Sequence, residues 1–214
     1  MMNILRQYFG LTSSQEQQFE ALQEIFSYWN ARINVISRQD MENLYERHIL
    51  HSLGIAKVIK FNDHTSVLDV GTGGGFPGIP LAIMFPSSNF LLVDSIGKKI
   101  TVVNAVVEKL GLTNVRAVQS RAENIEGKFD FVVSRAVTAL PDFFSWVKDK
   151  IKGDGFNELP NGVLYLKGGD VAKELAQLKN NHPKLKITSQ VFELSSFFKE
   201  EFFETKKVVY FTKY

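Results

Sequence analysis

The chain has 214 residues, of which 44% are hydrophobic and 22% are charged. These proportions are typical of a globular domain with a sizeable core, and no apolar run is long enough to cross a bilayer. The chain has no cysteine, which excludes disulfides, thiolate metal sites and a cysteine nucleophile. The net charge of +2 is compatible with a nucleic-acid partner but does not predict one. No secretory signal is visible, so we expect a cytoplasmic protein with no membrane partner.

The first part of the chain has the periodicity of helices. In residues 13–29 apolar side chains recur three or four positions apart, which indicates an amphipathic helix. Ser13 and Glu16 have the spacing of a capping box at its start. Residues 40–60 repeat the helical pattern, with Asp40 as the expected cap. The sequence therefore predicts a helical extension before the main domain.

Beyond the helical extension, short apolar runs alternate with helical stretches. The expected strands are 66–70, 89–95, 115–120, 129–134 and 162–168, and the expected helices are 77–85, 97–110, 139–151 and 170–181. Strands without polar alternation are buried on both faces, and strand–helix alternation is typical of parallel βαβ units. The last two apolar runs, 186–194 and 206–214, have no helix between them and are expected to pair antiparallel at the sheet edge. The predicted organisation is a helical extension over 1–62 and a doubly wound α/β, Rossmann-like domain over 63–214.

The segment "VLDVGTGGGFPGIP", residues 67–80, places five glycines directly after the first expected strand. Residues 73–78 match G-x-G-x-x-G, and Asp94 ends the next strand, a pattern that also fits a dinucleotide site. A pyrophosphate is held by free N–H groups at a helix start, but Pro77 and Pro80 have no N–H. The loop therefore favours a nucleoside ligand without a phosphate, such as S-adenosylmethionine, whose ribose hydroxyls Asp94 would bind.

Several segments together resemble the glucose-inhibited division protein B family. They are "DVGTGGGFPGIPLAI", "LLVDSIGKK", "VQSRAEN" and "FDFVVSRAV", with "NVISR" and "RHILHS" upstream. The resemblance implies a class I S-adenosylmethionine-dependent methyltransferase, with a seven-stranded, mostly parallel sheet and an antiparallel edge strand. It also implies that N7 of one guanine in 16S ribosomal RNA is methylated. The implied partner is 16S RNA or the small ribosomal subunit, and no DNA partner is expected.

The resemblance assigns cofactor contacts to residues that follow the expected strands. Gly71, after the first expected strand, would let the cofactor touch the backbone, and Phe76 in the same loop can pack on the cofactor. Alanine and glutamate after the third strand would meet the adenine, and arginine after the fourth could pair with the methionine carboxylate. With the ribose acceptor included, the predicted cofactor residues are Gly71, Phe76, Asp94, Ala122, Glu123 and Arg135.

RNA contacts are predicted at Lys167, His48 and Arg121. The lysine and the arginine fall at or just past the carboxyl ends of expected strands, while His48 lies on the second expected helix. A solvated or polar face is the plainer interpretation of these positions, and Lys167 is the preferred phosphate or guanine contact among the lysines. The family motif usually has an aspartate where this chain has His51, so no role of that carboxylate is transferred.

The expected chemistry needs no general base. Methylation at C5 of a pyrimidine usually requires a cysteine, and exocyclic amines are usually methylated beside an Asn/Asp-Pro-Pro-aromatic tetrad, where this chain has "SRAV" at 134–137. Guanine N7 carries a lone pair and no proton, so positioning suffices. We predict no catalytic acid or base and no metal. Three other functions remain open at this point: a small-molecule methyltransferase, a dinucleotide-dependent oxidoreductase, and a non-catalytic RNA-binding module.

Overall fold

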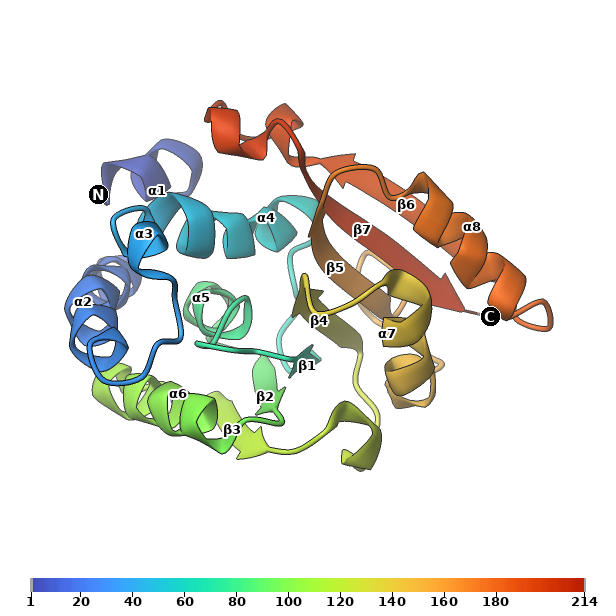
Figure 1. The fold of residues 1–214 in the computed structure, drawn as a ribbon, viewed down its shortest axis with the longest axis horizontal. Helices are drawn as coiled ribbons and strands as arrows, with labels where there is room; N and C mark the ends of the chain where they lie inside the picture. The colour runs from blue at the N-terminus through green and yellow to red at the C-terminus, as the bar shows by residue number, and fades with distance from the viewer. Residues whose placement is uncertain (1, 214) are drawn as a thin grey trace.

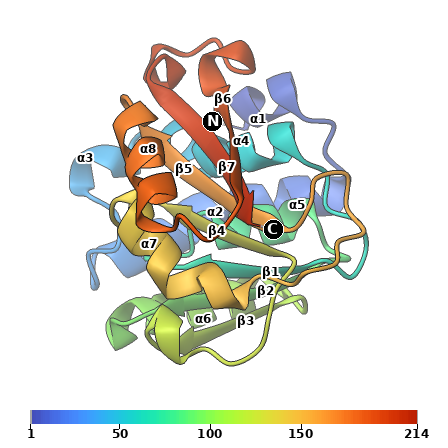
Figure 2. The same cartoon turned by 90° about the vertical axis from the view of Figure 1, so that its right-hand side faces the viewer.

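The computed structural model describes residues 2–213 as a single seven-stranded sheet with helices on both faces (Figures 1 and 2). Residue 1, where the expected extension begins, and residue 214, where the last expected strand ends, lie outside the described residues. The N-terminal elements are α1 (Asn3–Tyr8), α2 (Ser13–Asn30), α3 (Arg38–Met41), η1 (Leu44–Leu50) and α4 (His51–Val58). They are followed by β1 (Ser66–Val70), α5 (Gly78–Met84), β2 (Asn89–Asp94), α6 (Gly97–Leu110), β3 (Val115–Gln119), η2 (Ala122–Asn124), β4 (Phe131–Arg135), α7 (Leu140–Val147), η3 (Lys148–Lys150), β5 (Gly162–Gly168), α8 (Ala172–Asn181), β6 (Ile187–Glu193), η4 (Leu194–Ser196), η5 (Glu201–Phe203) and β7 (Lys206–Lys213).

The strand order is β3-β2-β1-β4-β5-β7-β6. The first five strands pair in parallel, and β7 pairs antiparallel with both β5 and β6. The predicted parallel sheet with an antiparallel edge is therefore confirmed. The sheet order reverses between β1 and β4, and this reversal places the loops that follow these strands around one crevice.

Each face of the sheet has its own buried cluster. The N-terminal helices, α5 and α6 pack on one face, where Leu92 and Phe131 are buried, and α7 and α8 cover the other, where Leu68 and Phe211 are buried (Figures 1 and 2). Successive strand residues point to opposite faces, so near-continuous apolar strands are what a two-sided sheet requires. The N-terminal helices share a core with the sheet, and the domain division at residue 62 stays a prediction.

The cap of the first expected helix differs from the prediction by one residue. The capping box at α2 uses Thr12 and Gln15, one residue earlier than the predicted Ser13 and Glu16, because Thr12 already has the extended backbone that a cap needs.

The helix expected over residues 40–60 is interrupted. Ser37, not Asp40, caps the short α3, and its hydroxyl accepts from the amide of Asp40. After a break the chain continues as η1, a π-helix, and then as α4. Within residues 2–213 no helix combines the length and the apolar character that a membrane span requires.

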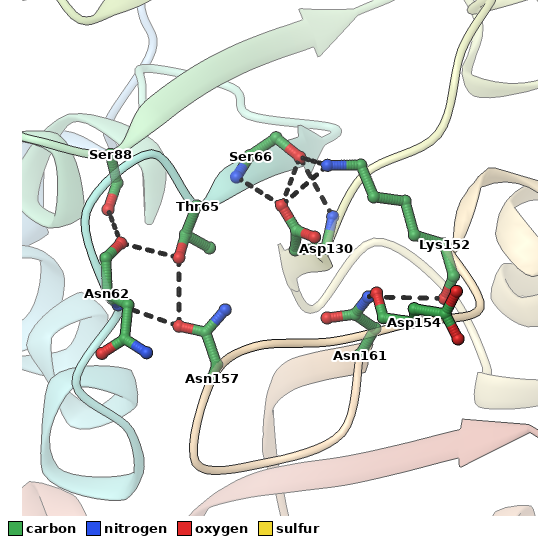
Figure 3. Close-up of polar contacts among 9 residues, drawn as sticks. All are labelled: Asn62, Thr65, Ser66, Ser88, Asp130, Lys152, Asp154, Asn157 and Asn161. Carbon is green, nitrogen blue, oxygen red and sulfur yellow. Dashed lines mark hydrogen bonds and ion pairs between the residues drawn. The ribbon is translucent and has the colours of Figure 1, made fainter.

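Most core strands and helices lie close to their predicted positions, but the helix expected over 139–151 ends at Val147 and is followed by the short η3. The strand expected at 129–134 runs from Phe131 to Arg135, because Phe129 forms an isolated bridge with Ile151 instead. The amino ends of β1 and β4 are closed by a polar network (Figure 3). In it the Asp130 carboxylate accepts hydrogen bonds from Ser66 N at 2.8 Å, Ser66 Oγ at 2.6 Å and Lys152 Nζ at 2.9 Å.

Candidate cofactor site

A cavity of about 550 Å3 opens at the carboxyl ends of β1, β2, β3 and β4. Ligands of doubly wound sheets bind at this edge, because the loops that follow parallel strands converge there. Five of the six predicted cofactor residues line the cavity: Gly71, Asp94, Ala122, Glu123 and Arg135. The structure thus brings together residues that lie far apart in the sequence.

Gly71 follows β1 directly and meets two requirements that only glycine satisfies. Its φ of 68° lies in the left-handed region, and a Cβ atom here would lie 2.5 Å from Val137 Cγ2. Its amide donates to the carbonyl of Val93 at 2.8 Å, which turns the chain toward β2. The bare backbone therefore lets the loops after β1 and β4 approach each other at the cavity.

Asp69 organises the glycine loop from inside the sheet. Its Oδ2 accepts hydrogen bonds from Thr72 Oγ1 at 2.6 Å and from the amide of Gly78 at 2.9 Å, while its Oδ1 is buried without a partner. Burial raises the pKa of Asp69 to about 7, although both hydrogen bonds act in the opposite direction. No role was predicted for Asp69 from the sequence, although a carboxylate inside an apolar strand is a signal for one.

The start of α5 has few amide groups left for an anion. The amides of Gly75, Phe76, Gly78 and Ile79 all donate to acceptors of β1 or of the loop itself. Pro77 has no N–H, and the cavity does not reach this turn. A pyrophosphate needs free amides at a helix start, so the geometry counts against the dinucleotide alternative.

Asp94 ends β2 with a fixed carboxylate at the cavity. Its Oδ2 accepts from the amide of Gly73 at 3.0 Å and its Oδ1 from that of Ile96 at 2.9 Å, and Lys99 Nζ lies 3.6 Å from Oδ2. The side chain is 7% exposed. A carboxylate held in this way has acceptor capacity left for hydroxyl groups of a ligand.

Arg135 ends β4 and brings a positive charge to the cavity wall. Its Nη2 donates to His48 Nδ1 at 2.9 Å and its Nη1 to the carbonyl of Arg47 at 3.3 Å. Burial lowers the pKa of Arg135 to about 10, and nearby carboxylates, Asp69 first among them, oppose the shift, so the group stays cationic at neutral pH. No ion pair described within residues 2–213 includes Arg135.

Phe76, the sixth predicted cofactor residue, does not line the cavity. Its ring is buried, stacks on Phe26 of α2 with centroids 5.0 Å apart, and lies 5.2 Å from the guanidinium of Arg135. The Phe76 ring thus packs near the guanidinium of Arg135. A direct contact of Phe76 with a cofactor stays a prediction.

The three residues predicted to contact RNA lie in different surroundings. Arg121 is exposed and lines the cavity. Lys167 Nζ lies 2.5 Å from Glu174 Oε2 and donates to the carbonyl of Thr138, so its charge is already paired. His48 is enclosed beside Arg135. Of the three, Arg121 has the position most accessible to a large ligand, and all three assignments stay predictions.

His51, which replaces the usual aspartate of the family motif, is almost fully buried. Its ring packs edge-on against Phe202 and Phe203, with centroids 5.4 and 6.1 Å away, and its Nε2 has no hydrogen-bond partner. Burial lowers the pKa of His51 well below its usual value. The neutral ring therefore serves as packing for the C-terminal phenylalanines.

Three apolar residues of the cavity were not predicted from the sequence. Ile96 and Val137 line it with 41% and 39% of their surface exposed, and Trp146 of α7 completes the wall. An apolar residue in a helix or after a strand looks like core in a sequence, so no pattern distinguished these three. Exposed apolar side chains around a cavity suit a flat aromatic ligand group.

The loop after β4 is held in a constrained conformation. Ala136 has a φ of 49°, which is uncommon for a residue with a side chain, and it lines the cavity. The hydroxyl oxygen of Tyr165 accepts from the amides of Val137 at 2.8 Å and Thr138 at 3.0 Å. These bonds from β5 fix the loop that carries Val137 over Gly71.

These residues fit S-adenosylmethionine. Asp94 offers acceptors for ribose hydroxyls, Arg135 offers an unpaired cation for a carboxylate, and Ile96 and Trp146 offer apolar contact for an adenine. The amides that a phosphate would need are already bonded. Within residues 2–213 no three His, Asp or Glu side chains gather closely enough to hold a metal ion.

The fold is shared with solved structures of proteins that bind or depend on S-adenosylmethionine. M. jannaschii TYW2 in complex with AdoMet superposes with a TM-score of 0.58 at 16% identity, covering 86% of this chain and 78% of that one. A SAM-dependent methyltransferase from Aquifex aeolicus gives a TM-score of 0.56 at 16% identity, covering 82% of this chain and 98% of that one. The fold is therefore that of the class I S-adenosylmethionine-dependent methyltransferases.

Sequence similarity narrows this class to one family. Residues 15–201 match GidB, the rRNA small subunit methyltransferase G family. The ribosomal RNA small subunit methyltransferase G of Flavobacterium johnsoniae is 56% identical over 210 residues, which cover 98% of this chain and 97% of that protein. The chain belongs to the rRNA small subunit methyltransferase G family, as the resemblance of its motifs predicted.

Proposed function

We propose that this chain transfers a methyl group from S-adenosylmethionine to N7 of a specific guanine in 16S ribosomal RNA. The observation that carries the proposal is its similarity to ribosomal RNA small subunit methyltransferase G over nearly the whole chain. The lining of the cavity supports the proposal independently. Asp94 offers an acceptor for ribose, Arg135 offers a cation without a carboxylate partner, and Ile96 and Trp146 form an apolar wall around the same cavity.

The bound cofactor would supply an electrophilic methyl group on a sulfonium. Asp94 would accept hydrogen bonds from its ribose hydroxyls, and Arg135 would pair with its carboxylate. Ala122 and Glu123, which follow β3 at the cavity, would meet the adenine. The backbone at Gly71 would lie against the methionine portion. Each of these residues binds and orients, and none moves a proton.

Attack by guanine N7 is consistent with the chemical groups present. The chain has no cysteine for C5 methylation. Ser134, near the end of β4, has its hydroxyl already bonded to the carbonyl of Val70 at 2.7 Å. N7 attacks without losing a proton, so catalysis is positioning in a site sheltered from water. Positioning of this kind supplies about 7–11 kcal/mol in intramolecular reactions.

A methyl-transfer assay tests the proposal directly. Purified protein is mixed with labelled S-adenosylmethionine and 16S RNA, or small subunits, from cells that lack the gene. We expect label at N7 of one guanine, and little label on RNA from cells that carry the gene, because that site is already methylated. Label at another atom, or no label on RNA or subunits, would contradict the proposal.

The same assay and one binding measurement separate the alternatives. A small-molecule methyltransferase would bind S-adenosylmethionine but leave RNA unlabelled, and a non-catalytic module would bind RNA without transfer. A dinucleotide enzyme would prefer NAD over S-adenosylmethionine in equilibrium binding. We further propose that the partner is 16S RNA or the small ribosomal subunit and that the protein is cytoplasmic, where both are found.

A further inference from the structure

The guanidinium of Arg135 has more donors than the protein uses. It carries five N–H groups, of which the described contacts use one on Nη1 and one on Nη2, and neither acceptor is a carboxylate. We infer that His48 is a positioning residue, which fixes Arg135 so that its remaining donors face the cavity and receive the carboxylate of the cofactor's amino-acid portion. This inference rests on the proposed function, because it requires S-adenosylmethionine in the cavity.

The bond between the two side chains defines the state of the imidazole. A guanidinium can only donate, so His48 Nδ1 accepts at 2.9 Å and the ring proton sits on Nε2. Burial, reinforced by the positive charge of Arg135, lowers the pKa of His48 to about 3. The ring therefore stays neutral at physiological pH and holds the cation without repelling it.

The backbone that carries His48 is itself unusual. Arg47 and His48, the two residues that contact Arg135, both lie in the π-helix η1. π-helical turns are rare, and they occur frequently at functional sites. Ser52 Oγ donates to the carbonyl of His48 at 2.6 Å, which holds this turn from the next one. A regular helix was expected here, and both acceptors of Arg135 come from this wider turn.

Two aromatic rings complete the support. The Arg135 guanidinium lies 5.2 Å from the ring centroid of Phe76, and the His48 ring also lies 5.2 Å from it. Phe76 in turn stacks on Phe26 of α2. The guanidinium of Arg135 is thus held by hydrogen bonds to η1 and by the Phe76 ring of the glycine loop. An N-terminal helical segment therefore shapes the cavity at the edge of the sheet.

The inference separates His48 from a direct RNA contact, which the sequence predicted. The residue is neutral, and its Nδ1 is already bonded to Arg135, so it offers no charge to a phosphate. A positioning role affects the cofactor's amino-acid portion alone, whereas an RNA contact affects the RNA alone. A purely structural role affects every ligand equally.

Calorimetric titration with two thioether ligands distinguishes these roles. S-adenosylhomocysteine carries the amino-acid portion, and 5′-methylthioadenosine lacks it, while both share the adenosine. We expect His48→Leu to weaken S-adenosylhomocysteine about tenfold, or about 1.4 kcal/mol, and to leave 5′-methylthioadenosine unchanged. His48→Gln, whose amide oxygen can accept from Arg135, should recover most of the affinity.

Controls keep the result interpretable. His182→Leu changes a histidine that packs on Phe144 away from the cavity and should alter neither affinity. Thermal unfolding of each variant reports whether it is folded. Equal loss for both ligands, no loss for S-adenosylhomocysteine, or a glutamine variant as weak as the leucine variant would overturn the inference. If the wild-type chain binds neither ligand, the proposed function fails instead.

Discussion

The two ends of the parallel sheet differ in whether their buried charged groups have partners within the protein. At the amino end, Asp130 is bonded to Ser66 and Lys152, and although burial raises its pKa, these hydrogen bonds hold it below the usual value (Figure 3). At the carboxyl end, Asp69 has one oxygen without a partner and a pKa raised to about 7, and Arg135 has no carboxylate partner.

The difference shows which end is built for stability and which for binding. A buried charge without full compensation costs stability, so it persists only where something else requires it. The amino end satisfies its groups internally and needs no ligand. The carboxyl end keeps the Arg135 cation and the unusual backbone of Ala136 at the cavity, and the unpartnered Asp69 oxygen within β1. Variants at the two ends should therefore separate stability from binding.

The largest expected effect is the pH dependence that Asp69 gives to stability. Its pKa is about 7 in the folded chain against an ordinary 3.8, so the folded state binds more protons between these values. The stabilising contribution is complete below pH 3.8 and is lost as the pH rises through about 7, an effect of about 4 kcal/mol at 1.36 kcal/mol per unit. Chemical denaturation at several pH values should show that Asp69→Asn lacks this decline. If the free energy of unfolding changed with pH in the same way for Asp69→Asn and wild type, the buried Asp69 would not be the cause of the decline.

Asp130→Ala should be the most damaging change at the amino end. It leaves the Ser66 amide without its acceptor and leaves Lys152 Nζ with Ser66 Oγ alone. The lost carboxylate is buried but Lys152 is 40% exposed, so the cost should be about 3 kcal/mol, in the range for losing a buried charged acceptor. Urea denaturation measures the loss, while cofactor affinity of the folded variant should not change. Asp149→Ala removes a carboxylate from an ion pair in which it is 81% exposed, so this control should have little effect. A weakened cofactor affinity in Asp130→Ala would break the separation between the two ends.

Arg135→Ala should have the reverse outcome. Loss of a charged hydrogen bond should weaken S-adenosylmethionine binding by about 1.5–3 kcal/mol. The free energy of unfolding should fall less than in Asp130→Ala, because removal of a buried cation without a carboxylate partner offsets the loss of its hydrogen bonds to His48 and Arg47. Titration calorimetry and denaturation together test this. Arg116→Ala, at an exposed position of β3, is the matched control. Unchanged affinity in Arg135→Ala would remove Arg135 from the site.

The smallest effects separate backbone strain from contact in the glycine loop. Gly71 and Gly73 both have positive φ, so alanine at either should cost about 1–2 kcal/mol of stability. Only at Gly71 would the new Cβ also meet Val137, at 2.5 Å, and nothing lies within 4 Å at Gly73. We expect reduced cofactor affinity for Gly71→Ala alone. Equal affinity losses would show that strain, and not the contact with Val137, is responsible.

The regular elements were predictable because local chemistry and the fold agree. α6 matches its predicted range 97–110, and the left-handed Gly111 ends it as a C-cap. η1 was not predictable, because its apolar residues also suit a regular helix, and the contacts of Arg47 and His48 with Arg135 exist only in the folded chain.

The same distinction applies to the site. Residues that follow parallel strands must converge, so the sequence could place Asp94 and Arg135 at one edge. Phe76 was expected at the cavity, but the packing of Phe26 draws its ring into the core. Trp146 was not foreseen, since its place at the cavity depends on how α7 packs against η2.

The position of β7 has a consequence for how the sheet is completed. β7 follows β6 in the sequence but lies between β5 and β6, and it is the sole strand partner of β6 within residues 2–213. β6 therefore cannot join the sheet until residues 206–213 have taken their place beside β5. A chain truncated before residue 206 would keep β6 without a strand to pair with, and an unpaired strand of this kind is open to aggregation.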